Sequence, residues 1–520
     1  MKGTLINMKI AFRTDGGCQG LGLGHLMRCI ALAEAFQYKQ IDCLFICRDY
    51  DPAVKLILKH GFALETISHT LSLDKDQQIT QKLTRDADIV IIDGYAFTSQ
   101  FLASMQIHAP YVVYFDDLFD RDLPVNAVIA NASLEANASL ERSSYAIKLH
   151  SHTLLLSGPE YLPLRKEFHD LLPKTTSALS SIKRLLITFG GEDAPNVTQQ
   201  VVEMLSNVSL APNSQHEKLS LEILLGSAYR HQASLEKALS ISTYPHSYRI
   251  HRDILNPLSL YQEADLVLTA SGTTIWELAA AGVPMLIIQT AENQCRTAQY
   301  AQQQQLGIVL GWRGAINAIA IQKGLDALSD HSRRLEFSKR GQALVDGKGA
   351  ERIAEALIKD YKQQTISFRK PDVNPVGSDS RLLWEWRNDP LTRQMSRTMD
   401  FIPWEGHQAW YVRIMHDPGK IVLIACQADK PVGMIRFDSL DLELDRAEIN
   451  INMNPAMRGM GMGKRVLQAA CRYAFIEMEL SGIYAEVKAE NIASIKAFEG
   501  VGFVFQEEHE GMRMYLLSLN

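Results

Sequence analysis

The sequence predicts an α/β protein in which two doubly wound domains with parallel sheets precede a smaller α+β domain. Continuous apolar runs alternate with amphipathic helices up to about residue 360, a pattern that indicates parallel sheets covered on both faces. Beyond residue 366 the strand patterns follow one another directly, which favours an antiparallel sheet. A chain of 520 residues has room for roughly three domains, and we place them at 8–165, 166–362 and 366–520.

Four short β-rich runs define the first domain, 8–165. They lie at 9–13, 42–47, 88–93 and 111–117, with helices expected at 26–37 and 53–59. Parallel sheets of this kind bind ligands at the carboxyl ends of their strands. The polar residues expected along that rim are Arg13, Asp15, His25, Asp93, Asp116 and Asp117.

The turn Gly20–Arg28 (GLGLGHLMR) follows the first strand and opens an apolar helix. Its three glycines allow a sharp turn and a close approach to a ligand, and the helix N-terminus suits a diphosphate. A histidine at this point exchanges a proton near neutral pH, so we expect His25 to face a nucleotide-sugar next to Gly24 and to help water attack it. The alternative is a strand–turn–helix elbow with a capping histidine.

A second domain, 166–362, repeats this organisation. Its strand patterns lie at 184–189, 221–226, 264–269 and 284–288, and a helix pattern covers 275–281. Glycines 190 and 191 follow the first strand, and the turn Ser271–Thr274 opens the helix, where backbone N–H groups and hydroxyls suit a phosphate. The carboxylate of Glu277, one turn into that helix, suits the two hydroxyls of a ribose; the alternative is a first-turn acid favoured by the helix dipole.

The composition argues against several classes of function. A net charge of −6 without a basic cluster disfavours nucleic acid or a membrane surface as a partner. No apolar run is long enough to span a bilayer and the N-terminus lacks a signal-peptide layout, so we expect a cytoplasmic protein. Seven cysteines without a C-x-x-C pair argue against a disulfide framework or a zinc site. No metal is expected; Cys18 as a nucleophile and Asp116–Asp117 as a metal site are alternatives.

Four segments of the first two domains resemble one enzyme family. They are Gly22–Cys29 (GLGHLMRC), Tyr114–Leu118 (YFDDL), Phe189–Asp193 (FGGED) and Ser271–Pro284 (SGTTIWELAAAGVP). In this order and spacing they resemble the nucleotide-sugar hydrolases of pseudaminic acid biosynthesis. These enzymes are similar to the bacterial lipid II glycosyltransferase, so the resemblance implies two Rossmann-like domains in the glycosyltransferase-B (GT-B) arrangement.

The resemblance implies that UDP is released from UDP-2,4-diacetamido-2,4,6-trideoxy-β-L-altropyranose to leave the free sugar. It implies a catalytic role for His25, and the chemistry allows Asp15 or Asp93 to orient its imidazole. UDP is a weakly basic leaving group, so helix N-termini can neutralise it without a metal. The family's UDP-holding and sugar-contacting positions match Gly190, Gly191, Ser271, Gly272, Thr273, Glu277 and, within Glu292–Gln294, Asn293; we add Arg13, Asp15, Gly24 and Asp93 to the expected substrate-binding residues.

The third domain, 366–520, follows a helix expected at 343–360 and a polar join at 361–365. A hairpin is expected across the Ala428-Asp429 turn. The remaining expected elements are strands at 366–369, 421–427, 430–437, 446–453 and 484–487 and helices at 379–388, 407–415 and 466–478.

The segment Asn454–Arg465 (NPAMRGMGMGKR) places a glycine-rich loop between a strand and a helix, which suits a pyrophosphate. It matches Arg-x-x-Gly-x-Gly, and the Asn-x-x-Ser pattern at 491–494 with Gly502 and Phe503 follows. Together these segments closely resemble the GNAT N-acetyltransferases. The resemblance implies acetyl-CoA as co-substrate, held by Arg458, Gly459, Gly461, Gly463, Lys464 and Asn491.

One position departs from the GNAT pattern. Many members carry a tyrosine where this chain has Phe498, and that tyrosine protonates the departing CoA thiolate. Three other tyrosines, or water, are alternatives: Tyr473, Tyr484 and Tyr515. Glu448 lies on the strand before the loop, where these enzymes often place a water-linked base, and a surface carboxylate is an equal alternative.

The fusion of the two parts narrows the expected substrate. The third domain resembles the enzyme that acetylates UDP-4-amino-4,6-dideoxy-N-acetyl-β-L-altrosamine, the step before the hydrolase. We therefore expect a bifunctional enzyme with UDP-sugar substrates. The alternatives are a GT-B glycosyltransferase fused to an acetyltransferase, the equivalent steps of a legionaminic acid route, and a nucleotide-sugar binding scaffold in which one half is not catalytic. Sequence alone leaves the oligomeric state open.

Overall fold

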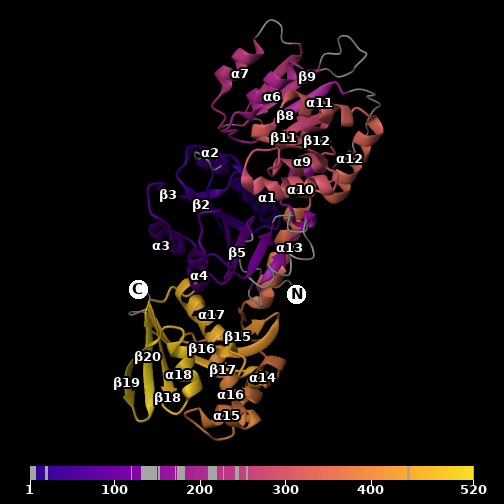
Figure 1. The fold of residues 1–520 in the computed structure, drawn as a ribbon. Helices are drawn as coiled ribbons and strands as arrows, with labels where there is room; N and C mark the ends of the chain where they lie inside the picture. The colour runs from indigo at the N-terminus through magenta and orange to yellow at the C-terminus, as the bar shows by residue number, and fades with distance from the viewer. Residues whose placement is uncertain are drawn as a thin grey trace. The chain divides into compact units, whose positions relative to one another are not determined.

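The structure, a computed structural model, describes most of the chain (Figure 1). It divides into two compact units, Met1–Ile358 and Lys359–Asn520. The described residues are 8–17, 22–118, 120–130, 149, 153–169, 171, 182–208, 219–226, 228–240, 245–252, 254, 256–441 and 445–518.

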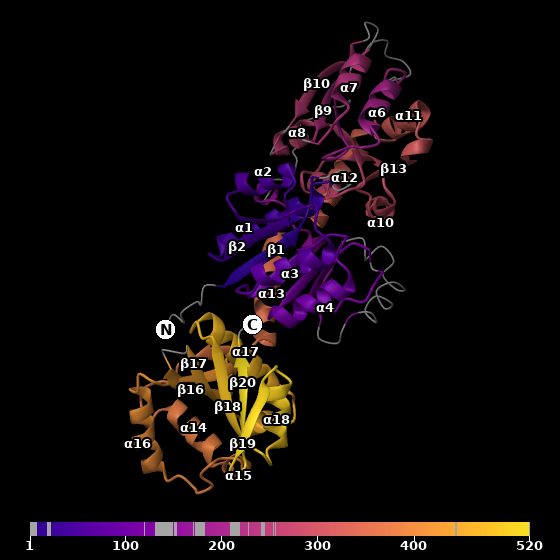
Figure 2. The ribbon, with the colours of Figure 1, turned by 90° about the vertical axis from the view of Figure 1, so that its left-hand side faces the viewer.

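The first sheet of unit 1 is parallel throughout, with strand order β3-β2-β1-β4-β5-β6-β7. Strands β4 and β5 are buried along their whole length, which explains their continuous apolar sequence. Helices α3 and α4 lie side by side against this sheet (Figure 2). The elements are β1 (Lys9–Thr14), α1 (Gly24–Tyr38), β2 (Asp42–Arg48), α2 (Asp51–Lys59), β3 (Ala63–Ile67), α3 (Leu73–Leu83), β4 (Ile89–Asp93), α4 (Ser99–His108), β5 (Val112–Asp116), β6 (Ala127–Ala130) and β7 (Leu154–Leu156).

The second sheet of unit 1 is also parallel, in the order β10-β9-β8-β11-β12-β13. Its two faces are covered by separate clusters of buried apolar side chains. The elements are β8 (Arg184–Thr188), α6 (Val197–Leu205), β9 (Ser220–Leu225), α7 (Gln232–Leu239), β10 (Ser247–Arg252), α8 (Leu258–Glu263), β11 (Leu266–Ala270), α9 (Thr274–Ala280), β12 (Met285–Gln289), α10 (Cys295–Gln303), β13 (Gly307–Trp312), α11 (Ala318–Ala327), α12 (His331–Leu344) and α13 (Gly349–Gln364). Four short 3-10 turns, η2 to η5, lie at Pro159–Tyr161, Lys166–Phe168, Glu292–Gln294 and Arg313–Ala315.

The last helix expected at 343–360 is confirmed only from Gly349 onward, and the polar join expected at 361–365 is wrong. Helix α12 ends at Leu344, and α13 runs from Gly349 through the expected join to Gln364. Gly347 causes the break, because its φ is +82° and a Cβ there would lie 2.1 Å from the carbonyl oxygen of Phe168.

Unit 2 contains a mixed sheet in the order β14-β15-β16-β17-β18-β20-β19. The expected hairpin is confirmed, since β15 and β16 are antiparallel and both turn residues, Ala428 and Asp429, have positive φ. The expectation of an antiparallel sheet is only partly right, because β17 and β18 are parallel. The elements are β14 (Ser367–Arg369), α14 (Ser378–Asn388), α15 (Pro390–Gln394), α16 (Trp404–Met415), β15 (Ile421–Gln427), β16 (Lys430–Asp441), β17 (Arg446–Met453), η6 (Pro455–Met457), α17 (Met462–Ile476), β18 (Gly482–Lys488), α18 (Ile492–Glu499), β19 (Val504–His509) and β20 (Met512–Ser518).

Candidate active sites

His25 lies in the first turn of α1, and its side chain is almost completely buried. Its Nδ1 atom is 2.7 Å from Oδ1 of Asp93, which is fully buried at the carboxyl end of β4. Of the two carboxylates considered as partners of the imidazole, the structure brings Asp93 to it. Within the described residues, Nε2 of His25 has no hydrogen-bond partner.

Arg28, one turn further along α1, joins two carboxylates. It donates to both oxygens of Asp93 at 2.6 Å and to both oxygens of Asp117 at 2.9 Å. Burial alone would raise the pKa of Asp93, but the charges of Arg28 and His25 outweigh it and hold that pKa far below its usual range. Burial likewise lowers the pKa of Arg28, and Asp117 and Asp93 more than restore it.

This charge arrangement assigns the histidine tautomer. Nδ1 of His25 lies 2.7 Å from Asp93, which when ionised only accepts hydrogen bonds, and 3.1 Å from Arg28, which only donates. The shorter contact, with Asp93, places the proton on Nδ1. In an imidazole that is protonated on Nδ1 alone, the lone pair is on Nε2. The ring of Tyr95 meets the imidazole edge-on at 4.6 Å, and its hydroxyl donates to Asp117 at 3.3 Å. Within the Gly22–Cys29 segment, sequence reasoning selected only His25 and Gly24 and missed that Arg28 holds this group of charges together.

A sulfur atom lies inside the same group. The thiol of Cys29 is fully buried and lies 3.6 Å from Oδ2 of Asp93. Burial, and next the charge of Asp93, raises the pKa of Cys29 well above its usual value. Cys18, the cysteine considered as a nucleophile, lies outside the described residues.

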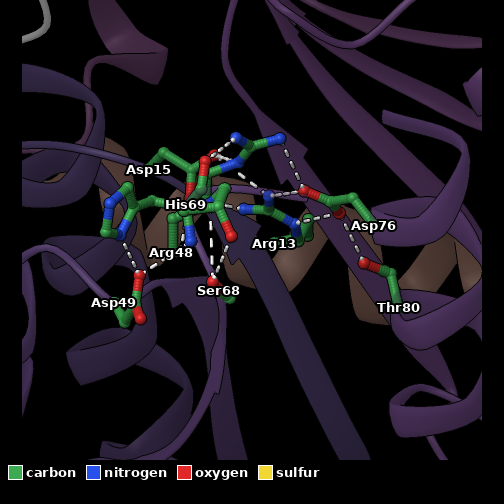
Figure 3. Close-up of polar contacts among 9 residues, drawn as sticks. Arg13, Asp15, Arg48, Asp49, Ser68, His69, Asp76 and Thr80 are labelled. Carbon is green, nitrogen blue, oxygen red and sulfur yellow. Dashed lines mark hydrogen bonds and ion pairs between the residues drawn. The ribbon is translucent and has the colours of Figure 1, made fainter. Parts of the chain in front are cut away.

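Arg13 and Asp15 belong to a second charge cluster, shown in Figure 3. The guanidinium of Arg13 is fully buried and donates to Asp15 at 2.7 and 3.0 Å and to Asp76 at 3.1 and 2.6 Å. The backbone N–H of Arg48 donates to Asp15 at 2.7 Å. All these groups have partners within the protein, and His25 is not among them. The polar rim expected from the sequence is therefore two separate clusters.

Three glycine-rich turns converge in unit 1. A Cβ built on Gly24, the first residue of α1, would lie 3.6 Å from Oγ1 of Thr273, the residue before α9. A Cβ on Gly191 would lie 3.8 Å from the backbone nitrogen of Leu23. Gly190 has a φ of +84°, which favours glycine. The start of α1, the turn after β8 and the turn after β11 thus meet, and the first of them carries the backbone N–H groups that suit a diphosphate.

The turn at Ser271–Thr273 is supported from the segment after β12. Ser271 is buried, and its hydroxyl is 3.4 Å from Oε1 of Gln294, which also accepts from the backbone and hydroxyl of Thr290. Gly272 lies beside the Gln294 amide. Asn293 lies in η4, and its side chain is outside the described part of the structure.

Glu277 is held by two residues that sequence reasoning did not find. Its carboxylate accepts from Arg165 at 3.1 Å and from the hydroxyl of Tyr261 at 3.1 Å. Burial raises the pKa of Glu277, and the charge of Arg165 offsets part of that effect. These bonds fix the carboxylate and leave further lone pairs free for a ligand. A cavity of about 60 Å³ is lined by residues of this group and of the His25 group, including Gly24, Arg28, Arg165, Thr273, Trp276 and Glu277.

In unit 2 the loop between β17 and α17 exposes backbone N–H groups. Gly459 and Gly461 have φ of +76° and +70°, and a Cβ on either would meet no atom within 4 Å. Gly461 precedes the first turn of α17, which no side chain caps. A Cβ built on Gly463 would lie 3.9 Å from Cγ of Met453, and the side chain of Lys464 lies near Gly500. An uncapped helix start on an open glycine turn fits the pyrophosphate of acetyl-CoA.

Arg458 is not free within this loop. Its guanidinium donates to Asp389 at 2.6 Å and to the hydroxyl of Thr392 at 2.5 Å, so it ties the loop to the start of α15. Asn491 likewise has a structural role, since its side chain caps α18 by accepting from the backbone of Ser494 at 3.2 Å. Arg458 and Asn491 each keep hydrogen-bonding groups that a ligand could use, and both shape the surface that would bind it.

Strands β17 and β18 pair over only three residues and then diverge. The last pair in register is Glu448 with Tyr484, and beyond it no described residue of 449–453 pairs with 485–488. Each strand pairs on its other side, with β16 and β20 respectively. The two facing edges therefore present free backbone groups, which an extended ligand with amide groups can satisfy. Oε1 of Glu448 is 3.4 Å from the amide of Asn450, and the side chain is partly exposed.

Similarity to known proteins agrees with the division of the chain into two units. The Glycosyltransferase family 28 C-terminal domain matches residues 184–357. The spore coat polysaccharide biosynthesis protein SpsG of Bacillus subtilis is 22% identical over 371 residues, 69% of this chain and 100% of its own. The crystal structure of MurG from Acinetobacter baumannii covers 68% of this chain and 99% of its own, with a TM-score of 0.50 and 11% identity. Unit 1 thus has two Rossmann-like domains of the GT-B fold, as expected.

The acetyltransferase (GNAT) domain matches residues 373–504. The N-acetyltransferase p20 of Bacillus licheniformis is 31% identical over 148 residues, 27% of this chain and 79% of its own. The C-terminal part of the chain belongs to the GNAT acetyltransferases. Within this family, the acetyltransferase PseH of Campylobacter jejuni is 23% identical over 127 residues, 24% of this chain and 78% of its own. The GNAT domain implies acetyl-CoA as co-substrate.

The described residues contain neither a metal-binding cluster nor a membrane-spanning helix. No group of three or more His, Cys, Asp or Glu there is arranged to hold a metal ion. No helix in that part of the chain is long and apolar enough to cross a membrane.

Proposed function

We propose that the chain is a bifunctional enzyme of pseudaminic acid biosynthesis. Its GNAT domain acetylates the C4 amine of UDP-4-amino-4,6-dideoxy-N-acetyl-β-L-altrosamine. Its GT-B domains then hydrolyse the product, UDP-2,4-diacetamido-2,4,6-trideoxy-β-L-altropyranose, to the free sugar and UDP. The similarity to PseH supports the first step, and the motifs around His25 support the second.

The observation that carries the hydrolytic step is the state of His25. Its Nδ1 proton is held by an ionised Asp93, and Nε2 is left without a partner among the described residues. Nε2 takes a proton from water as the water attacks the anomeric carbon and the bond to UDP breaks. The N–H groups at the start of α1 and in the converging turns hold the diphosphate and stabilise its developing charge. Glu277, fixed by Arg165 and Tyr261, accepts the ribose hydroxyls.

In the acetyl transfer, the chain's own groups have two tasks. The open loop at 459–463 binds the pyrophosphate, and the diverging edges of β17 and β18 bind the extended arm of the co-substrate. Glu448 is the last residue of β17 that pairs with β18, and it takes the proton from the attacking amine directly or through water.

A second candidate for unit 1 is a glycosyltransferase that moves the sugar to an acceptor. The match to a glycosyltransferase family 28 domain and the MurG-like fold favour it. The same helix N-termini would hold UDP in a glycosyl transfer. Only the dependence of UDP release on an acceptor therefore distinguishes glycosyl transfer from hydrolysis. Release of UDP without any acceptor supports hydrolysis.

The test is a coupled assay on the full chain. We supply the UDP-4-amino sugar with and without acetyl-CoA and follow free CoA and free UDP. CoA should appear first, UDP should follow only when acetyl-CoA is present, and NMR of the freed sugar should give the L-altro configuration. A legionaminic acid configuration would correct the substrate, and CoA without UDP would refute the hydrolytic step.

His25→Ala should stop UDP release and leave CoA release unchanged. His60→Ala is the matched control, because His60 also pairs with a carboxylate, Glu34 at 3.0 Å, but lies before the edge strand β3, whereas His25 follows the central strand β1. Loss of UDP release in both variants would mean that the effect of His25 is structural.

A further inference from the structure

Acetyl transfer from a thioester leaves a thiolate that takes up a proton. Phe498 stands where many GNAT enzymes have a tyrosine for this purpose, and its ring is buried and packs edge-on against Phe503 at 4.9 Å. It has no hydroxyl, so another group is needed. The sequence offers Tyr473, Tyr484 and Tyr515, and the structure separates them.

Tyr473 lies far from the place where β17 and β18 diverge. Its ring packs against Phe368 on β14 at 5.7 Å, and β14 is three strands away from β17 in the sheet. Three strand spacings correspond to about 14 Å. Tyr515 is closer but fully buried, and its hydroxyl already donates to Glu499 at 3.3 Å.

Tyr484 lies at the point of divergence itself. It pairs in register with Glu448, and parallel neighbours in register point to the same face of a sheet about 5 Å apart. Its side chain is partly exposed, and its hydroxyl makes no hydrogen bond within the described part of the chain. A free phenol thus lies beside the carboxylate that is suited to act as base.

We propose that Tyr484 is the general acid of the acetyl transfer, an inference that rests on the proposed acetyltransferase function. The amine nitrogen bonds to the acetyl carbon and gives its proton to Glu448. The C–S bond breaks, the sulfur keeps the electron pair, and the hydroxyl of Tyr484 gives it a proton. The proton on Glu448 then returns to the phenolate, directly or through water, which restores both groups.

Three Tyr→Phe variants of the full chain test the assignment in the acetylation assay. Tyr484→Phe should lower kcat for acetylation about 100-fold or more, the range that general acid catalysis supplies, with little change in KM. Tyr473→Phe, the matched control, should leave kcat unchanged. Loss of kcat in Tyr515→Phe with normal rates in Tyr484→Phe would overturn the proposal.

A change of leaving group separates acid catalysis from a structural role. The selenoester analogue of acetyl-CoA releases a selenolate, a weaker base that leaves without a proton. The loss of kcat caused by Tyr484→Phe should shrink strongly with this donor. An equal loss with both donors would mean that Tyr484 only shapes the site.

Binding gives a test that needs no acceptor and no turnover. If Tyr484 donates to the sulfur, the wild-type protein should bind CoA roughly tenfold more tightly than desulfo-CoA, and Tyr484→Phe should abolish that preference in calorimetry. An unchanged preference would overturn the proposal. If the wild-type protein fails to acetylate the UDP-4-amino sugar, the proposed substrate is wrong, while this comparison still decides the role of Tyr484.

Discussion

The two candidate active sites are built in opposite ways. The His25 site is a buried group of charges that satisfy one another: Arg28 joins Asp93 to Asp117, and Asp93 holds the imidazole. The site between β17 and β18 is an interrupted sheet whose edges and whose Tyr484 hydroxyl have no partner among the described residues. The first is oriented before any ligand arrives, whereas the second is completed by the ligand. Substitutions of the side chains that orient His25 should therefore act on rate, and substitutions in the open glycine loop of the second site should act on binding.

The largest effect should come from the bond that orients His25. Asp93→Asn replaces an acceptor by an amide that also donates, so the Nδ1 proton is no longer fixed and Arg28 loses a charged partner. We expect UDP release to fall about 10³-fold, within the range attributed to a positioned acid or base. Steady-state kinetics should show the loss in kcat, with acetylation unaffected. A normal kcat would contradict the contrast between the two sites, because the buried charges around His25 would then have no role in catalysis.

Two variants of Arg28 distinguish the effect of its charge from the effect of its bidentate geometry at the same site. Arg28→Ala should lower kcat for UDP release about 100-fold, because Asp93 and Asp117 lose the cation that joins them. Arg28→Lys keeps the charge but lacks the bidentate fork, so it should recover part of the rate. Arg184→Ala, which removes an exposed pair with Glu263, is the control and should be silent. Equal losses in the alanine and lysine variants would show that the bidentate geometry alone matters.

Substitutions in the glycine loop at 459–463 should mainly change the affinity for CoA. Gly461→Ala has open space for its methyl group, but its φ of +70° costs an L-residue about 1–2 kcal/mol. We expect the Kd of CoA to rise roughly tenfold at an almost unchanged kcat. Gly406→Ala is the control, since a Cβ there also meets nothing and its φ is not positive. A fall in kcat without a change in Kd would contradict the view that the ligand completes this site.

The smallest effect is on stability in acid. The folded pKa of Asp93 is depressed, so its stabilising contribution is complete above the unfolded pKa and is lost as the pH falls towards the folded pKa. The difference in unfolding free energy between wild type and Asp93→Asn should shrink by about 1.4 kcal/mol per pH unit below roughly pH 4. Urea unfolding of the N-terminal unit at several pH values measures it. A difference independent of pH would mean that Asp93 is not held ionised by its partners.

The longer buried strands followed from the sequence, whereas the edge strands and the buried but four-residue β6 did not. Strands β4 and β5 are buried on both faces, so their apolar runs stand out. Strands β3 and β10 lie at sheet edges with mostly exposed or partly exposed residues, and their mixed sequences gave no signal. The break between α12 and α13 depends on a contact between Gly347 and Phe168, which are remote in sequence.

The candidate sites show the same limit. His25, Gly461 and Glu277 stand in motifs with local spacing, so they were found. Asp93 was found as a possible partner of His25, but Arg165 and Arg28 were missed: Arg165 lies 112 residues before Glu277, and Arg28 lies 65 residues before Asp93. Only the folded sheet brings such pairs together. The roles of all these residues in catalysis remain predictions.

The position of Cys29 has a consequence for the resistance of the enzyme to oxidation. Peroxides and alkylating agents react with the thiolate, and the thiolate of Cys29 is suppressed by burial and by the adjacent carboxylate of Asp93. The same negative charge that holds the imidazole of His25 thus keeps the neighbouring sulfur inert. The candidate site around His25 contains a cysteine, yet thiol reagents and oxidants should leave Cys29 unmodified.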